Sequence, residues 1–333
     1  MKPLYRHMIP VIMSLLLIAC SKSDTSPEDG DENPGNGSGN ETRTPIPYDK
    51  LPASGREFTI LGPQFYVDLM GRQRPVLPAF KATNVKPGTL KGYVKDIYGR
   101  PLPGAQIGVR SSIIGGGYSS ASATSDANGF YEILLPVGNV EIWGAKYLMD
   151  YESAKAPVSL FPADSNLNSF NSTDGAVKNF VLLPYGQGRP DQISKGPYWP
   201  SSYLGAAIHL SYTLRTQSLP LPGSFPVGTI IVIKLTPLDL VHADEKVSFT
   251  IRKVIESNEL YINNIPIGKY KIEVKLESGA NILMRENINL KPLYGMKPKQ
   301  ATGVAEVTFI PGEPEILAWY GNWWIVPIII EHP

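Results

Sequence analysis

The chain has 333 residues, of which 42% are hydrophobic and 18% charged, so it is long enough for two domains with packed cores. Its formal net charge of +1 gives no general attraction to nucleic acid, and its single cysteine excludes both an intramolecular disulfide framework and a thiolate zinc cage. The 31 glycines and 31 prolines favour turn-rich β-structure over helices.

The first 20 residues have the pattern of a secretion signal. Two basic residues precede a short apolar run over residues 8–18, which falls below the roughly 20 apolar residues of a permanent membrane span. The sequence at 17–20 resembles a bacterial lipoprotein box. This resemblance implies that the signal peptide 1–19 is removed and that Cys20 receives diacylglycerol and palmitate, which anchor the protein to a membrane. The alternative is an ordinary signal peptide with an incidental cysteine.

Residues 20–47 have the composition of a disordered acidic tether. The segment contains six acidic and two basic side chains and almost no apolar ones, so it cannot offset the entropy cost of ordering. Ser21 follows the cysteine where an aspartate would favour inner-membrane retention, which predicts sorting to the outer membrane. The acidic stretch is also similar to the tethers of surface lipoproteins in the Bacteroidota, which favours exposure at the cell surface.

Beyond the tether, strand-like runs alternate with turn signals about every 8 to 12 residues, as in all-β proteins. We therefore predict two tandem antiparallel β-sandwich units of the seven-stranded type. The expected divisions are an N-terminal extension over 48–84, a first sandwich over 85–186, a linker packing on a domain over 187–223, and a second sandwich over 224–333.

An internal repeat supports two related units. Residues 129–142 align without a gap on residues 259–272, and both segments contain Pro-x-Gly at the same place. This pattern predicts a hairpin in each unit. Upstream, Gly-Thr at 88–89 is echoed at 228–229, where each pair is expected to open a first strand. The alternative is that any Pro-x-Gly hairpin would align as well.

The first unit resembles a known family. Residues 90–96, 99–107, 124–131 and 135–138 are similar to the carboxypeptidase regulatory-like domain, and the resemblance covers about 100 of the 333 residues. It implies a seven-stranded sandwich with a prealbumin-like, carbohydrate-binding-like fold. Such domains accompany peptidases, outer-membrane transporters and many secreted proteins, so the resemblance specifies the fold rather than the function. The second unit lacks the Gly-x-Pro-x-x-Gly-Ala stretch.

Recognisable catalytic motifs are missing from the sequence, and we expect no catalytic residues and no cofactor. The motifs Gly-x-Ser-x-Gly, His-Glu-x-x-His and Gly-x-x-x-x-Gly-Lys-Ser/Thr do not occur. His209 lies in an apolar strand, where a hydrogen-bonded structural histidine is expected. His242 is expected in a solvated loop between strands.

A calcium site is a weak candidate at the segment 164–168. Its oxygen-bearing side chains have the spacing that begins a calcium loop, but Ser169 and Gly175 stand where glycine and a bidentate glutamate belong. An irregular site using Asp164 and Asp174 is one interpretation. A polar turn held by Asx hydrogen bonds is the other.

The C-terminal aromatic segment is the candidate ligand-binding site. If residues 321–322 form a two-residue turn, Tyr320 faces Trp323 and Trp319 faces Trp324. Adjacent strand residues point to opposite faces, so only one pair can join the core. The other pair would contact a glycan, contact a partner protein, or pack on the linker or the other domain.

The leading hypothesis is a non-catalytic outer-membrane lipoprotein that acts as a binding module for carbohydrate. The alternative is an envelope scaffold or assembly protein that binds another protein through a sheet edge or the aromatic hairpin. A hydrolase with dispersed carboxylates is a third hypothesis. The expected partners are the membrane, through the lipid anchor, and a glycan or an envelope protein, with no nucleic acid.

Overall fold

The computed structural model describes residues 54–71, 74–166, 168–188, 199–217, 221–287, 292–312, 321 and 323–333. The regular structure of these residues is β-strand with short 3-10 turns, which confirms the predicted all-β class. In this part of the chain no helix has the length and apolarity needed to cross a membrane. The signal peptide, Cys20 and the tether lie outside the described residues.

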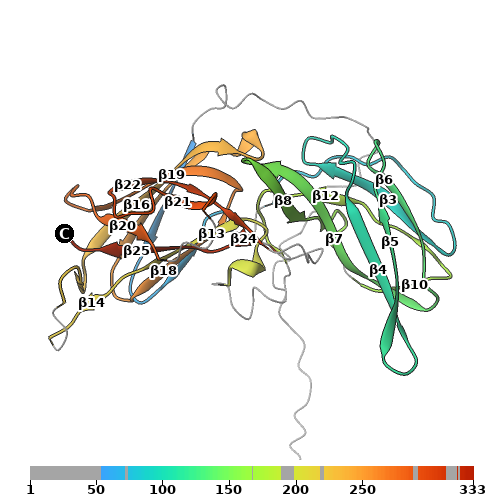
Figure 1. Cartoon of the computed structure of the whole chain (residues 1–333), viewed down its shortest axis with the longest axis horizontal. Helices are drawn as coiled ribbons and strands as arrows, with labels where there is room; N and C mark the ends of the chain where they lie inside the picture. Colours follow the sequence, from blue (N-terminus) through green and yellow to red (C-terminus); the bar gives the residue numbers. More distant parts are fainter. Residues whose placement is uncertain are drawn as a thin grey trace, which may run out of the picture. The chain divides into compact units, whose positions relative to one another are not determined.

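The first sandwich contains two five-stranded sheets (Figure 1). One sheet has the order β10 (Phe170–Asn171), β7 (Asn139–Tyr151), β4 (Gln106–Ile113) and β5 (Gly117–Thr124), and β8 (Ala154–Ser159) pairs with β7. The other has the order β11 (Ala176–Val177), β3 (Thr89–Asp96), β12 (Phe180–Leu182) and β9 (Phe161–Pro162), and β6 (Phe130–Leu134) pairs with β3.

The second sandwich contains a six-stranded and a five-stranded sheet. The six-stranded sheet has the order β1 (Ser54–Ile60), β17 (Val247–Val254), β16 (Ile230–Leu240), β19 (Gly268–Leu276), β22 (Val304–Thr308) and β21 (Gly295–Lys297). The five-stranded sheet has the order β2 (Tyr66–Asp68), β18 (Glu259–Ile265), β13 (Ala206–Ser211), β25 (Val326–Glu331) and β20 (Leu283–Glu286).

Strand alternation explains how these sheets bury a core. On β16, Ile231, Ile233 and Leu235 are completely buried, whereas the intervening Lys234 is exposed. Successive strand residues point to opposite faces, so a period of two places every second side chain inside. Burial of one such aliphatic side chain stabilises the fold by roughly 1.5–3 kcal/mol.

The two sandwiches have the same strand pairing. In the first, β3 pairs antiparallel with β6 and parallel with β12, and β4 pairs with β5 and β7. In the second, β13 pairs antiparallel with β18 and parallel with β25, and β16 pairs with β17 and β19. The strand that corresponds to β3 is therefore β13. The expected equivalence of 88–89 with 228–229 is wrong, and the segment 187–223, expected to be a linker, contains β13 of the second sandwich.

The predicted hairpin at Pro-x-Gly is also wrong, although the repeat itself is real. β6 pairs with β3 and β7 pairs with β4, so the connection between them crosses from one sheet to the other. The same holds for β18 and β19. Gly138 has a φ of 115°, and a Cβ on Gly268 would lie 2.3 Å from the carbonyl oxygen of Asp239. Both glycines are therefore required by backbone geometry at a crossing between sheets.

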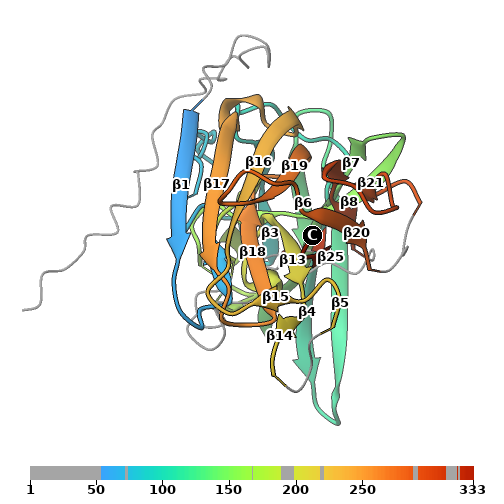
Figure 2. The same cartoon turned by 90° about the vertical axis from the view of Figure 1, so that its left-hand side faces the viewer.

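The N-terminal extension supplies strands to the second sandwich. β1 pairs in parallel with β17 over seven residues, from Ser54 opposite Val247 to Ile60 opposite Lys253, and β1 lies beside β17 in Figure 2. β2 pairs in parallel with β18. The buried Lys253 ammonium donates to the carbonyl oxygens of Gly62 at 3.0 Å and Gln64 at 2.7 Å. The first sandwich is therefore inserted between the N-terminal strands and the rest of the second.

Candidate binding site around Trp143

The most distinctive feature of the first sandwich is an exposed tryptophan, Trp143, on β7 of the sheet that also contains β4 and β5. The β4–β7 register shifts between Gly108 and Val109, which pair with Gly144 and Ile142 respectively. Trp143 is thus the extra residue on β7 at this shift and is paired with no residue of β4. Such a bulge redirects a side chain on the bulged strand. The Trp143 indole is turned across β4 and keeps 39% of its surface exposed.

Gly108 makes room for this ring. A Cβ at position 108 would lie 2.6 Å from the Cε2 and Nε1 atoms of the Trp143 indole, closer than real Cβ atoms come to any neighbour. A glycine inside a strand otherwise weakens the strand, so its presence here is explained by the close approach of the ring. The indole consequently packs over the backbone of β4 and is only partly exposed to solvent.

A shallow cavity of about 350 Å³ opens beside the indole. This volume lies at the lower end of the roughly 300–1,000 Å³ typical of small-molecule sites. The side chains that line it offer one aromatic surface and several hydrogen-bonding groups, and no carboxylate is among them. The lining residues are Gln106, Ile107, Gly108, Ser122, Ala123, Thr124, Trp143, Gly144, Ala145 and Lys146. We call this cavity the Trp143 groove.

A second aromatic ring stands on the same face of the sheet. Arg110 and Tyr118 occupy outward positions on β4 and β5, in register with the residues of the groove. The Arg110 guanidinium lies 4.2 Å from the centre of the Tyr118 ring, and its Nε donates to Glu141 at 2.6 Å. This contact holds the ring of Tyr118, which is 55% exposed, against the sheet.

The C-terminal aromatic residues are divided between core and surface. Trp323 is buried and packs edge-on against Tyr151, with ring centres 5.2 Å apart, whereas Trp324 is 36% exposed. These two tryptophans form β24 (Trp323–Trp324), which pairs with β23 (Ile310–Pro311). Trp319 and Tyr320 lie outside the described residues, so the expected pairs Tyr320–Trp323 and Trp319–Trp324 are not described.

The segment proposed as a calcium candidate is a polar turn with a lysine. Asp164 accepts hydrogen bonds from the backbone of Asn166 at 3.0 Å and from the Lys178 ammonium at 2.5 Å. Lys178, which is buried, also donates to the Asn166 carbonyl at 2.9 Å. Asp174 accepts from Thr173. The ammonium neutralises the carboxylate that a calcium ion would need, and within the described residues no group of three or more His, Cys, Asp or Glu side chains could hold a metal.

The two histidines have different environments. His209 Nε2 lies 3.1 Å from a carboxylate oxygen of Glu259, and its ring stacks on Tyr261 with centres 4.3 Å apart. The prediction of a hydrogen-bonded strand histidine is therefore confirmed. His242 is 2% exposed, so the prediction of a solvated loop is wrong.

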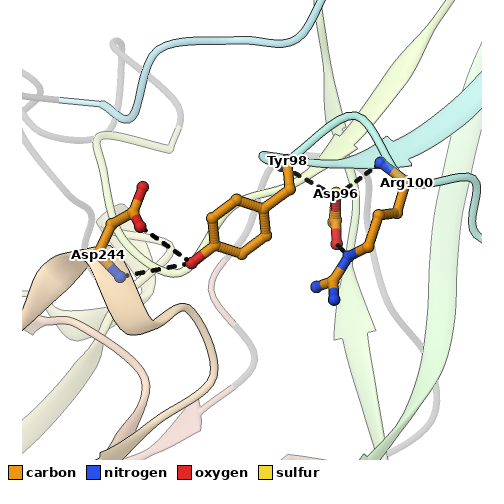
Figure 3. A network of polar contacts seen from close by, with 4 residues as sticks. All are labelled: Asp96, Tyr98, Arg100 and Asp244. Atoms are coloured by element: carbon orange, nitrogen blue, oxygen red, sulfur yellow. Dashed lines mark hydrogen bonds and ion pairs between the residues drawn. The ribbon is translucent and has the colours of Figure 1, made fainter. Parts of the chain in front are cut away.

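A long-range contact explains the burial of His242. Its ring lies 5.6 Å from that of Tyr98 in the first sandwich, and the Tyr98 hydroxyl lies 3.3 Å from the Asp244 carboxylate (Figure 3). Nearby, the Tyr185 hydroxyl donates to Glu245 at 3.0 Å. Burial raises the pKa of Tyr98, so its hydroxyl remains protonated.

The turn after β3 directs Tyr98 toward this contact. The Asp96 carboxylate accepts from the backbone N–H groups of Tyr98 at 2.9 Å and Arg100 at 3.0 Å, and from the Arg100 side chain at 2.5 Å (Figure 3). An aspartate that binds the backbone two and four residues ahead fixes a tight turn. The polar network therefore fixes the turn that carries Tyr98.

Comparisons with known proteins find solved structures of low similarity to the chain. No protein-family model and no curated protein matches the chain. The solved structures that are similar to it include the following three. The Bacillus anthracis TIE protein is 13% identical over 74% of this chain, with a TM-score of 0.30, and this chain spans 34% of that protein's length. A streptococcal ancillary pilin is 11% identical over 74% of this chain and 68% of its own, with a TM-score of 0.22. A DUF3823 family protein from Bacteroides uniformis is 12% identical over 67% of this chain and 99% of its own, with a TM-score of 0.19.

Sequence reasoning missed Trp143. The available signal was Gly108, a glycine between the buried apolar residues Ile107 and Val109 inside a predicted strand. Such a glycine indicates that another group approaches the backbone closely. Identification of that group required the register between β4 and β7, which the sequence does not contain.

Proposed function

We propose that the protein is a non-catalytic lipoprotein that binds carbohydrate in the Trp143 groove. The single observation that supports this most strongly is the indole of Trp143, which packs over Gly108 and keeps 39% of its surface exposed. A flat aromatic face suits the apolar C–H face of a sugar ring, and the indole N–H adds a polar handle.

The other groups of the groove fit the same ligand class. A sugar presents hydroxyl groups around its rim, which both donate and accept hydrogen bonds. The amide of Gln106 and the hydroxyls of Ser122 and Thr124 can do the same, and the Lys146 ammonium can donate. Few polar groups around an apolar surface are typical of small-ligand sites. The resemblance of the first sandwich to the carboxypeptidase regulatory-like domain, with its carbohydrate-binding-like fold, supports the proposal further.

The groove is tested by glycan-array screening of the full chain, followed by calorimetry with the best ligand. We expect Trp143→Ala to weaken binding at least tenfold. Trp324→Ala is the matched control, since it removes an equally exposed tryptophan elsewhere. Loss of binding in the control with retention in Trp143→Ala would transfer the site to the C-terminal aromatic segment. Turnover of a polysaccharide by the purified protein would contradict the non-catalytic role.

The same proposal places the protein at the outer membrane, anchored through Cys20 and facing the cell surface. The sequence of the first 47 residues supports this, with a lipoprotein box followed by an acidic tether. Cys20→Ala should abolish metabolic palmitate labelling and release the protein from the membrane fraction. Surface exposure is tested by protease treatment of intact cells, which should digest the protein without lysis.

A further inference from the structure

In the described part of the chain, β5 is the last strand of its sheet and no strand pairs with its outer edge. Among the strands that the structure describes, β5 pairs with β4 alone. Its sequence, Gly-Tyr-Ser-Ser-Ala-Ser-Ala-Thr, contains no charged residue and no proline over eight residues. Natural proteins usually protect such an edge with charges, proline, bulges or short strands, because its free backbone groups can pair with another chain. An open edge of this length therefore calls for an explanation.

The second sandwich shows what fits at this position. β5 pairs antiparallel with β4, which also pairs with β7. β17 pairs antiparallel with β16, which also pairs with β19. β5 and β17 therefore occupy equivalent positions in the two sandwiches. The outer edge of β17 is covered by β1, which runs parallel to it over seven residues. Within the described part of the chain, the same fold thus occurs twice, once with the added strand and once without it.

The side chains of β5 match an incoming strand with alternating apolar residues. Ala121 on β5 pairs with Val109 on β4, and Phe249 on β17 pairs with Leu235 on β16. Ala121 is therefore the counterpart of Phe249. Ala121 and Ala123 are only partly buried against the core. Larger apolar side chains from a neighbouring strand could cover them, as Phe58 of β1 does beside Ile251.

We propose that the outer edge of β5 binds an extended segment of a partner protein, which adds as a parallel strand with apolar residues at alternate positions. β1 of the same chain is already paired with β17, and the proposal assigns the added segment to another polypeptide. A second copy joined edge to edge about a two-fold axis would place β5 antiparallel to β5, whereas the internal template is parallel. The parallel pairing of β1 with β17 therefore supports a strand from a partner protein as the segment that binds β5.

The test uses the full chain and a synthetic peptide with the β1 sequence Ser-Gly-Arg-Glu-Phe-Thr-Ile. Amide hydrogen exchange is measured with and without saturating peptide. We expect exchange across residues 117–124 to slow at least tenfold, with no change across β17, which shows that the peptide adds to β5 rather than replacing β1. A peptide with proline at the positions of Glu57 and Phe58 should give no protection, and this control requires no protein variant.

Two variants separate strand addition from other binding modes. Ala121→Lys places an inward charge on the edge and should abolish protection by the peptide, whereas Ser120→Lys, on the outward side of the same strand, should retain it. Trp143→Ala should also retain it, which makes this result independent of the glycan proposal. Unchanged exchange of β5 at saturating peptide would overturn the inference. So would protection of β5 that rises with protein concentration without peptide, because this would assign the edge to a second copy.

Discussion

The indole of Trp143 occupies the space that a side chain at position 108 would fill. This relationship links an otherwise unfavourable strand glycine on β4 to the orientation of an aromatic ring on β7. The ring is fixed before any ligand arrives, so binding would not need to order it, and a flat exposed surface is available at little entropic cost. The pair Gly108–Trp143 is thus the most direct place to test the site.

We predict that Gly108→Ala displaces the indole and weakens glycan binding by at least tenfold, although Trp143 remains present. The added methyl group would lie within 2.8 Å of three indole atoms, so the ring must rotate away from the sheet. Tryptophan fluorescence quenching by acrylamide should rise in the variant, and calorimetry gives the affinity. Ser120→Ala, on the same outer face, is the control. Unaltered affinity in Gly108→Ala would mean that the ring orientation is irrelevant.

We predict that Tyr98→Phe lowers the free energy of unfolding by about 1 kcal/mol, the usual net value of one hydrogen bond. The Tyr98 hydroxyl lies 3.3 Å from the Asp244 carboxylate and accepts from the Asp244 backbone N–H at 3.4 Å. Urea unfolding measures the effect. The exposed Tyr118→Phe should stay within about 0.5 kcal/mol of the wild type. Equal effects of the two substitutions would contradict a role of the Tyr98 contact.

We predict that the stability of the protein depends on pH through Asp68. Burial raises the pKa of Asp68 from 3.8 to about 6, although hydrogen bonds from Tyr203 and Asn264 oppose the shift. Because the folded state favours the protonated carboxyl, its contribution to stability is present in full below about pH 4 and is lost as the pH rises through 6. Asp68→Asn cannot ionise, so its stability relative to the wild type should increase by roughly 2 kcal/mol between pH 4 and 6.

Urea midpoints at pH 4, 5, 6 and 7 check the Asp68 prediction. Other carboxylates titrate in both proteins, so the difference between variant and wild type isolates the one group. Parallel stability curves for the two proteins would show that Asp68 ionises normally.

The fourth prediction concerns calcium. Addition of calcium should leave the Tm of the wild type unchanged, because the Lys178 ammonium already neutralises Asp164. Lys178→Met should lower stability by about 1–2 kcal/mol through loss of the bonds to Asp164 and the Asn166 carbonyl, and calcium should not restore it. Differential scanning calorimetry with calcium and with a chelator measures both effects. A calcium-dependent rise in the wild-type Tm would revive the calcium interpretation.

The local sequence pattern was sufficient to predict the structural class and the internal repeat. The alternation of apolar residues and the Pro-x-Gly segments predicted strands and two related units, and both are present in the structure. The same pattern could not assign β7 to a different sheet from β6. A short connection between two strands is compatible either with a hairpin or with a crossing between sheets, and only the packing of the whole sandwich decides between them.

Other features could not be predicted because they depend on contacts between distant parts of the chain. β1 belongs to a sheet whose neighbouring strand begins at Val247, and the burial of His242 depends on Tyr98 in the other sandwich. No periodicity within either segment encodes these contacts. The orientation of Trp143 likewise depends on a bulge between Gly108 and Val109, because regular alternation would not turn its ring across β4.

The insertion of the first sandwich has a consequence for how the chain matures. Gln64 and Lys253 are 189 residues apart, yet the lysine binds the backbone of the glutamine. At about 5–20 residues per second, a nascent chain would expose β1 and β2 for roughly 10–40 seconds before their partners are synthesised. The first sandwich can fold during that interval. The earliest strands to emerge are therefore among the last to find their places, and during biogenesis they are the segments most in need of protection from aggregation.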